Sequence, residues 1–101
     1  MNIKKDPERN EIDALLEFVG DLAGKRVLEI GAGYGRLTWR YATRPVEVVG
    51  IDPNPEKIAR SQKEMPEALR GRVAMLETTL EDYWRAGRTQ LFDVALMSWV
   101  L

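Results

Sequence analysis

The 101-residue sequence contains neither cysteine nor histidine. Without cysteine the chain can form no disulfide and has no thiolate nucleophile, and without histidine it lacks the side chain that most often serves as a general base near neutral pH. Most zinc sites need one of these two residue types, so we expect no metal site. Any chemistry must therefore come from carboxylates, from the backbone or from a bound cofactor.

An excess of charge of one sign is also lacking. The chain has 15 basic and 16 acidic side chains, for a net charge of -1, so no strong field would draw it onto nucleic acid or an acidic membrane. No apolar run comes near the roughly 18 residues that can cross a bilayer, and residues 1–9 lack the apolar segment of a secretory signal. The sequence predicts a cytoplasmic protein without a membrane partner, and it does not indicate nucleic-acid binding.

What the chain does have is the composition of a globular domain, with 45% hydrophobic and 31% charged residues. Its length predicts a single domain over residues 1–101. Short apolar runs predict four strands, at residues 26–30, 46–51, 72–76 and 92–97. Helical patterns predict helices over residues 6–20, 36–43 and 55–65, and a short one that ends near Gly87. Single helices between successive strands favour a parallel sheet covered on both faces, in a three-layer α/β/α fold of the Rossmann-like class.

Three glycines, Gly31, Gly33 and Gly35, follow the first strand directly. In a sheet of this kind ligands bind beyond the carboxyl ends of the strands, beside the first strand. Glycines there allow a close approach of the backbone, and free N–H groups at the start of the next helix would favour a carboxylate or a phosphate. The alternative is an ordinary tight turn between strand and helix.

Asp52 ends the second predicted strand, 21 residues after Gly31. From that position a carboxylate can accept hydrogen bonds from both hydroxyls of a ribose. The alternative role is a cap for the following helix, but Asn54 and Pro55 already supply a capping residue and a proline at the first helical position.

Two families of nucleotide-binding domains share these features. The dinucleotide pattern G-x-G-x-x-G needs a glycine at position 36, where this chain has Arg36, and the third glycine comes one step early, at Gly35. This spacing argues against an NAD(P)-dependent oxidoreductase, which stays an alternative. A noncatalytic interaction module on the same fold is a second alternative.

The segment V-L-E-I-G-A-G-Y-G-R at residues 27–36 resembles motif I of class I S-adenosylmethionine-dependent methyltransferases. Residues 50–54 resemble the acidic strand-two motif of that family, and residues 92–98 resemble its strand-four motif. The resemblance implies methyl transfer from S-adenosylmethionine and the strand order 3-2-1-4. The family has a seven-stranded sheet, so it also implies a domain that is incomplete after strand four.

The resemblance further implies a role for each matching residue. Glu29 would organise the glycine loop and the waters at the amino group of the cofactor, the loop would pack against the methionine moiety, Asp52 would hold the ribose and Pro53 would touch the adenine. Thr79 stands where the family often has an aspartate for the adenine amino group, although it could equally be a helix cap. The predicted cofactor-binding residues are Glu29, Gly31, Ala32, Gly33, Gly35, Asp52, Pro53, Thr79, Leu80 and Ser98.

The sequence nominates no catalytic base and no methyl acceptor, although the near-zero net charge favours a small molecule. In the family strand four is internal, so here it would present an open edge beside Val94 and Leu96. We expect either a fragment of a longer enzyme or a homodimer through that edge. The larger aromatic side chains are expected to pack in the core or between helices; they are Phe18, Tyr34, Trp39, Tyr41 and Trp84.

Overall fold

A computed structural model describes residue 17 and residues 21–87 and 91–98. The helix predicted over residues 6–20 lies outside this part of the chain except for Glu17, and so does Phe18. Within the described helices, none is long and apolar enough to cross a membrane.

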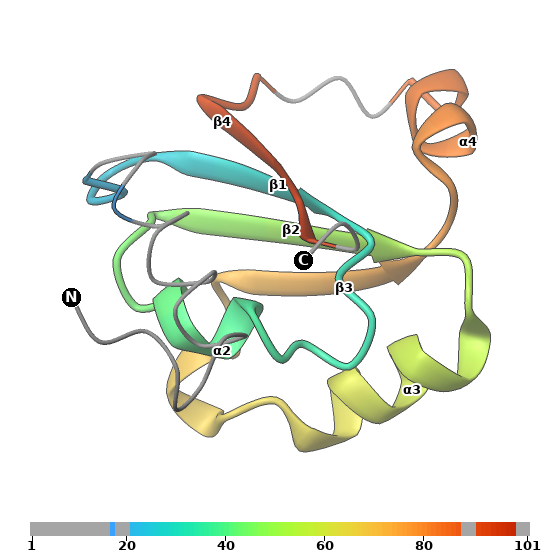
Figure 1. Ribbon diagram of the computed structural model, residues 1–101, viewed down its shortest axis with the longest axis horizontal. Coiled ribbons are helices and arrows are strands. Elements are labelled where there is room, and N and C mark those ends of the chain that lie inside the picture. The colour runs from blue at the N-terminus through green and yellow to red at the C-terminus, as the bar shows by residue number, and fades with distance from the viewer. Residues whose placement is uncertain (1–16, 18–20, 88–90, 99–101) are drawn as a thin grey trace, which may run out of the picture.

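Four parallel strands form one sheet in the order β3-β2-β1-β4 (Figure 1). The strands are β1 (Arg26–Ile30), β2 (Glu47–Asp52), β3 (Val73–Glu77) and β4 (Val94–Met97). The predicted parallel sheet and strand order are confirmed. The predicted bounds of β1 are confirmed too, those of β2 and β3 are each shifted by one residue, and β4 begins two residues later than predicted. Because all four strands run in the same direction, their carboxyl ends meet at one edge of the sheet.

The helices are α2 (Thr38–Tyr41), α3 (Pro55–Glu64) and α4 (Leu80–Arg85), with a 3₁₀ turn η1 (Glu67–Leu69) after α3. Asn54 caps α3 as predicted, since its side chain accepts a hydrogen bond of 3.0 Å from the Lys57 amide. Helix α3 ends at Glu64 because Met65 precedes Pro66 and takes an extended conformation. Helix α2 is shorter than predicted, because residues 36 and 37 are still in the turn that leaves the glycines.

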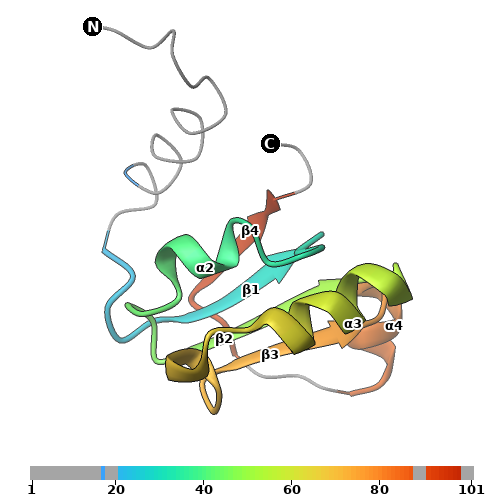
Figure 2. The ribbon, with the colours of Figure 1, turned by 90° about the horizontal axis from the view of Figure 1, so that it is seen from below.

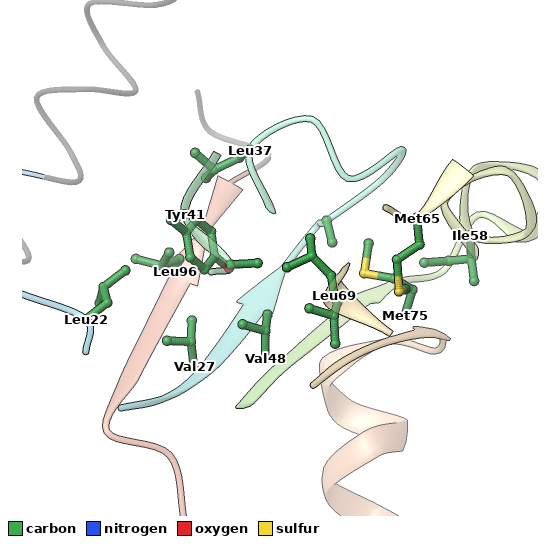
Figure 3. Packing of buried hydrophobic residues seen from close by; sticks show 13 residues of the cluster. Leu22, Val27, Leu37, Tyr41, Val48, Ile58, Met65, Leu69, Met75 and Leu96 are labelled. Atoms are coloured by element: carbon green, nitrogen blue, oxygen red, sulfur yellow. The ribbon is translucent and has the colours of Figure 1, made fainter. Parts of the chain in front are cut away.

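Helices α2 and α3 cover one face of the sheet, and α4 lies on the other (Figures 1 and 2). Neighbouring residues of a strand point to opposite faces, so each strand contributes to two apolar clusters. Val27 and Val48 pack with Tyr41 and Ile58 under α2 and α3 (Figure 3), whereas the adjacent Leu28 and Val49 pack with Tyr83 of α4. This alternation confirms the predicted three-layer arrangement.

The aromatic side chains do not all lie in this core. Tyr41 is buried, and Trp39 packs against the cluster under α2 and α3. The expectation was wrong for Tyr34 and Trp84, which are 39% and 68% exposed. Trp84 is on the outer side of α4, and Tyr34 belongs to the loop that leaves β1.

Candidate functional site

The glycine loop, residues 31–35, leaves β1 at the carboxyl edge of the sheet and is fastened to the end of β2. The amides of Gly31 and Ala32 both donate hydrogen bonds to the carbonyl oxygen of Ile51, at 2.8 and 3.0 Å. The three glycines have positive φ angles of 79°, 55° and 89°, a conformation that other residues rarely adopt. At Gly35 space is limiting too, because a Cβ atom would lie 2.3 Å from the ring of Trp39.

Asp52 joins the glycine loop to the start of α3. Its Oδ2 accepts a hydrogen bond of 3.1 Å from the amide of Gly33, and its Oδ1 accepts one of 2.9 Å from the amide of Asn54. A carboxylate has about four acceptor positions, and these two bonds leave half of them unused. Asp52 is partly exposed, so a ligand hydroxyl can reach it.

Four amides of the glycine loop, which precedes the helix start, already donate hydrogen bonds within the chain. The amides of Gly31, Ala32 and Gly33 donate to β2 and to Asp52, and the amide of Gly35 donates to the carbonyl oxygen of Ala32 at 3.0 Å. These donors are therefore not available to cradle a phosphate. The acceptors with unused capacity in the wall of the adjoining cavity are the carboxylates of Glu29 and Asp52, which suit a ligand that carries hydroxyl or ammonium donors.

Glu29 is a fully buried carboxyl one residue before the end of β1, at 0% exposure. Its Oε1 accepts two hydrogen bonds of 2.7 Å, from the hydroxyls of Thr38 and Tyr41 in α2. Its Oε2 has no hydrogen-bond partner within the described residues. Burial raises the pKa of Glu29 above its ordinary value, although the hydroxyls of Tyr41, Thr38 and Ser98 act in the opposite direction.

Ser98 directly follows β4 and contacts the glycine loop at Gly31. Its hydroxyl is close enough to Glu29 to lower the pKa of that carboxyl, but it donates to backbone carbonyl oxygens, with a shorter bond of 3.0 Å to Gly31 and a longer one of 3.4 Å to Ile30. With its proton directed there, Ser98 does not satisfy Oε2 of Glu29. Trp99, which follows Ser98, lies outside the described residues.

Two cavities meet at Gly31 and Asp52. The larger, of about 600 Å³, we call the loop cavity; the predicted residues that line it are Glu29, Gly31, Ala32, Gly33, Asp52 and Ser98. The smaller, of about 370 Å³, we call the strand-end pocket; the predicted residues that line it are Gly31, Asp52, Pro53, Thr79 and Leu80. Of the predicted set only Gly35 lines neither cavity, and its role is to let the chain turn against Trp39.

Of the two roles predicted for Thr79, adenine binding and helix capping, the structure shows the capping role. Its Oγ1 accepts a hydrogen bond of 3.0 Å from the amide of Asp82 and so begins α4. It also lines the strand-end pocket together with Ile30, Ile51 and Leu80. The walls of that pocket are largely apolar.

Several residues of the loop cavity were not predicted from the sequence: Tyr34, Arg36, Leu37, Trp39, Lys57, Arg60 and Glu64. Lys57 and Arg60 belong to a helix whose charges resemble an ordinary solvated face, so no sequence signal marked them. The structure places Lys57 Nζ 5.6 Å and Arg60 Cζ 4.8 Å from the centre of the Tyr34 ring. The described residues include no group of three or more His, Cys, Asp or Glu side chains that could hold a metal ion.

Comparisons with known proteins agree with this geometry. An uncharacterized methyltransferase of Mycobacterium tuberculosis is 41% identical over 66 residues, which are 65% of this chain and 26% of that protein. The chain thus spans about a quarter of that relative's length. Precorrin 8w decarboxylase of Methanobacterium thermoautotrophicum has a similar structure, with a TM-score of 0.72 and 21% identity over 85% of this chain and 46% of its own.

A third similar structure is phosphoethanolamine N-methyltransferase 1 of Haemonchus contortus, solved with phosphoethanolamine and S-adenosylhomocysteine. Its TM-score is 0.67 at 24% identity, over 90% of this chain and 19% of its own. The sequence family described as "Methyltransferase domain" matches residues 28–101, from β1 to the last residue. This chain, with its acidic residue and glycine loop after β1 and its carboxylate after β2, therefore belongs to the methyltransferase-domain family of S-adenosylmethionine-dependent methyltransferases.

Proposed function

We propose that the described residues bind S-adenosylmethionine, with Glu29 and Asp52 as the two polar anchors. The observation that carries this assignment is the unpartnered Oε2 of Glu29 in the wall of the loop cavity. A buried acceptor without a partner is costly. An ammonium group, or a water bound to one, would supply the missing donor, and the methionine end of the cofactor carries such a group.

The two cavities match the two ends of the cofactor. The adenine would occupy the strand-end pocket beside Pro53 and Leu80, and the methionine moiety would extend along the glycine loop toward Glu29. The ribose would lie between them at Asp52, which lines both cavities together with Gly31. Asp52 can accept from the ribose hydroxyls while it keeps its bond to Gly33, because a carboxylate oxygen accepts more than one hydrogen bond.

The protein's contribution to methyl transfer would be to bind, orient and shield the reacting groups. The cofactor itself supplies an activated methyl group on a sulfonium sulfur, so proximity and exclusion of water can provide much of the acceleration. Ser98, at the end of β4, borders the loop cavity on the side where we place the methyl group. We assign no general base.

A dinucleotide cofactor fits this site less well. A pyrophosphate needs several backbone donors at the glycine loop, and four of the loop amides already donate within the chain. Calorimetric titration of the chain with S-adenosylhomocysteine and with NADH tests the assignment. We expect binding of S-adenosylhomocysteine and none of NADH; the reverse result would overturn it.

The activity of the whole protein is also a proposal, since the chain spans about a quarter of the relative described above. We propose a small-molecule methyl acceptor, because the net charge of -1 gives no field for a polyanion. A panel of small-molecule and RNA acceptors, assayed with radiolabelled S-adenosylmethionine, would test this. Methylation of RNA alone would contradict it.

The high charge content is consistent with the cytoplasmic location that we also propose, and cell fractionation would check it.

The outer edge of β4 is the candidate contact with further polypeptide. Among the described strands β4 pairs only with β1. Met97, its last residue, is 48% exposed, and Leu91, which precedes the strand, is 86% exposed. We propose that this edge is covered either by later strands of a longer chain or by a second copy. Light scattering after size-exclusion chromatography of the 101-residue chain distinguishes the two. A dimer supports coverage by a second copy, and a monomer at high micromolar concentration excludes it.

A further inference from the structure

Tyr34 is an exposed aromatic residue in the middle of the glycine loop. It stands between Gly33 and Gly35, is 39% exposed and lines the loop cavity. A tyrosine that only filled space would be expected in the apolar core. Its position in a glycine loop therefore calls for another explanation.

The Tyr34 ring is held by two cations of α3. Lys57 Nζ lies 5.6 Å and Arg60 Cζ 4.8 Å from the ring centre, within the range of cation–π attraction. The two residues are three positions apart and so share one side of the helix. Arg60 also pairs with Glu64 at 3.2 Å, which restrains its guanidinium beside the ring.

Helix α3 is a firm support for these contacts. Asn54 caps its first turn, and its inner side is anchored by Ile58 and Ser61, both buried. The side chain of Lys57 follows the loop as well, since its Cδ would lie 3.7 Å from a Cβ atom at Gly33. The glycine loop is thus bounded by β2 on one side and by α3 on the other.

The loop needs such support because of its glycines. Glycine loses more conformational entropy on ordering than any other residue, and a ligand that had to order the loop would bind more weakly for that reason. Hydrogen bonds to the Ile51 carbonyl oxygen hold Gly31 and Ala32 in place, and a bond to the Asp52 carboxylate holds Gly33. Tyr34 is the only residue of the loop with a large side chain, and its contacts lie on α3.

We propose that Tyr34 is a positioning residue for the cofactor: its ring, held by Lys57 and Arg60, keeps the glycine loop in the binding conformation before the cofactor arrives. The link to affinity rests on the proposed function, but the effect on the loop does not. Because the loop is fastened in advance, the cofactor finds Asp52 and the loop backbone already arranged.

The test compares Tyr34→Ala with Tyr34→Phe, which keeps the ring without its hydroxyl. Amide hydrogen exchange of Gly33 and Gly35 is measured by NMR in the ligand-free 101-residue chain, and the affinity for S-adenosylhomocysteine is measured by calorimetry. We expect Tyr34→Ala to raise the exchange rates and to weaken binding about fivefold, the loss expected from partly exposed cation–π contacts. Tyr34→Phe should restore both values.

Two further variants complete the test. Lys57→Met combined with Arg60→Met leaves Tyr34 in place but removes the cations, and it should act in the same direction as Tyr34→Ala. Trp84→Ala, on α4, is the control because it also removes an exposed aromatic ring, but on the other face of the sheet, and it should change neither value. Circular dichroism establishes that each variant is folded.

The outcomes separate the two claims. Weaker binding by Tyr34→Ala without faster exchange would mean that the ring touches the ligand directly, and it would overturn the positioning role. Unchanged exchange and unchanged affinity would overturn it as well. If the wild-type chain binds no S-adenosylhomocysteine, the proposed function fails, whereas the exchange rates still decide whether Tyr34 holds the loop.

Discussion

The phenolic hydroxyl of Tyr41 donates a hydrogen bond of 2.7 Å to Oε1 of Glu29, so a buried carboxyl of the central strand β1 is tied to helix α2. Thr38 donates a second bond to the same oxygen. Burial, together with the neighbouring Glu29, raises the pKa of Tyr41 far above its ordinary value, so Tyr41 remains a donor throughout the physiological range. The arrangement satisfies one oxygen of Glu29 and leaves the other without a hydrogen-bond partner among the described residues.

The first prediction concerns the stability of the ligand-free chain. Glu29 has a pKa above its ordinary value of 4.5 in the folded state. Below pH 4.5 it is protonated in both states, and its stabilising effect is complete. As the pH rises further, the unfolded chain loses this proton first, so the free energy of unfolding falls by at most about 1.4 kcal/mol per pH unit until the folded pKa is passed.

Glu29→Gln should remove this component, because glutamine does not titrate. Urea unfolding of both proteins at a series of pH values measures it. As the pH rises above 4.5, the wild type should lose stability relative to Glu29→Gln. A constant difference across the series would show that the pKa of Glu29 is not raised.

The second prediction concerns cofactor binding by the same residue. An ammonium group prefers an ionised carboxylate, so binding should lower the pKa of Glu29 and release a proton. The affinity of the wild type for S-adenosylhomocysteine should therefore rise with pH across the window in which Glu29 titrates. Calorimetry in two buffers with different ionisation enthalpies measures the proton release, and Glu29→Gln should bind more weakly and release none.

The third prediction concerns Gly35. A Cβ atom at this position would lie 2.3 Å from the Trp39 ring, and φ is +89°. Gly24 is a matched control, since its φ is +74° and nothing lies within 4 Å of its Cβ position. Both Gly→Ala variants should lose about 1–2 kcal/mol for the backbone conformation, and Gly35→Ala should lose a further ~1–3 kcal/mol because Trp39 must move. Equal losses in urea unfolding would contradict the close packing at Gly35.

Much of the fold could be predicted from the sequence, because its signals are local. The run of β-branched residues before Gly31 and the Asn54-Pro55 pair predicted a strand and a helix start that the structure confirms. The strand order came from the family resemblance and is confirmed as well. A helix was predicted at residues 36–43, but its short length, Thr38–Tyr41, was not. The turn after Gly35 extends through residues that also suit a helix.

The site could be predicted only in part. Glu29 and Asp52 were predicted because carboxylates are unusual inside an apolar strand, as at Glu29, or directly at its end, as at Asp52. Their hydrogen bonds to Tyr41 and Gly33 were not foreseeable, since they depend on how α2 and the loop fold back onto the sheet. Tyr34, Lys57 and Arg60 meet only through tertiary packing, and no local pattern connects a loop tyrosine with cations more than twenty positions away.

The fourth prediction concerns Thr79. Its hydroxyl caps α4 through the amide of Asp82, so Thr79→Ala should lower the free energy of unfolding by about 1 kcal/mol, and Thr79→Ser should retain it. Thermal unfolding measures both. If the hydroxyl also accepts from the adenine amino group, as the family resemblance implies, the affinity for S-adenosylhomocysteine should fall about threefold in the alanine variant alone. If Thr79→Ala binds S-adenosylhomocysteine as tightly as the wild type, Thr79 has only its capping role.

The last prediction concerns Asp52, the residue that we propose as the ribose acceptor. Asp52→Ala removes this proposed acceptor and also the bonds to the Gly33 and Asn54 amides. Asp93→Ala is the control, because Asp93 likewise accepts a backbone hydrogen bond, from Arg26 at 2.9 Å, but at the opposite end of β1.

Calorimetric titration with S-adenosylhomocysteine, on wild type, Asp52→Ala and Asp93→Ala, is the most direct test of the cofactor site. We predict that the wild type binds, that Asp52→Ala binds at least about tenfold more weakly, a loss of about 1.4 kcal/mol, and that Asp93→Ala binds like the wild type. A folded Asp52→Ala protein with wild-type affinity, or a folded wild type that binds no S-adenosylhomocysteine, would contradict the assignment.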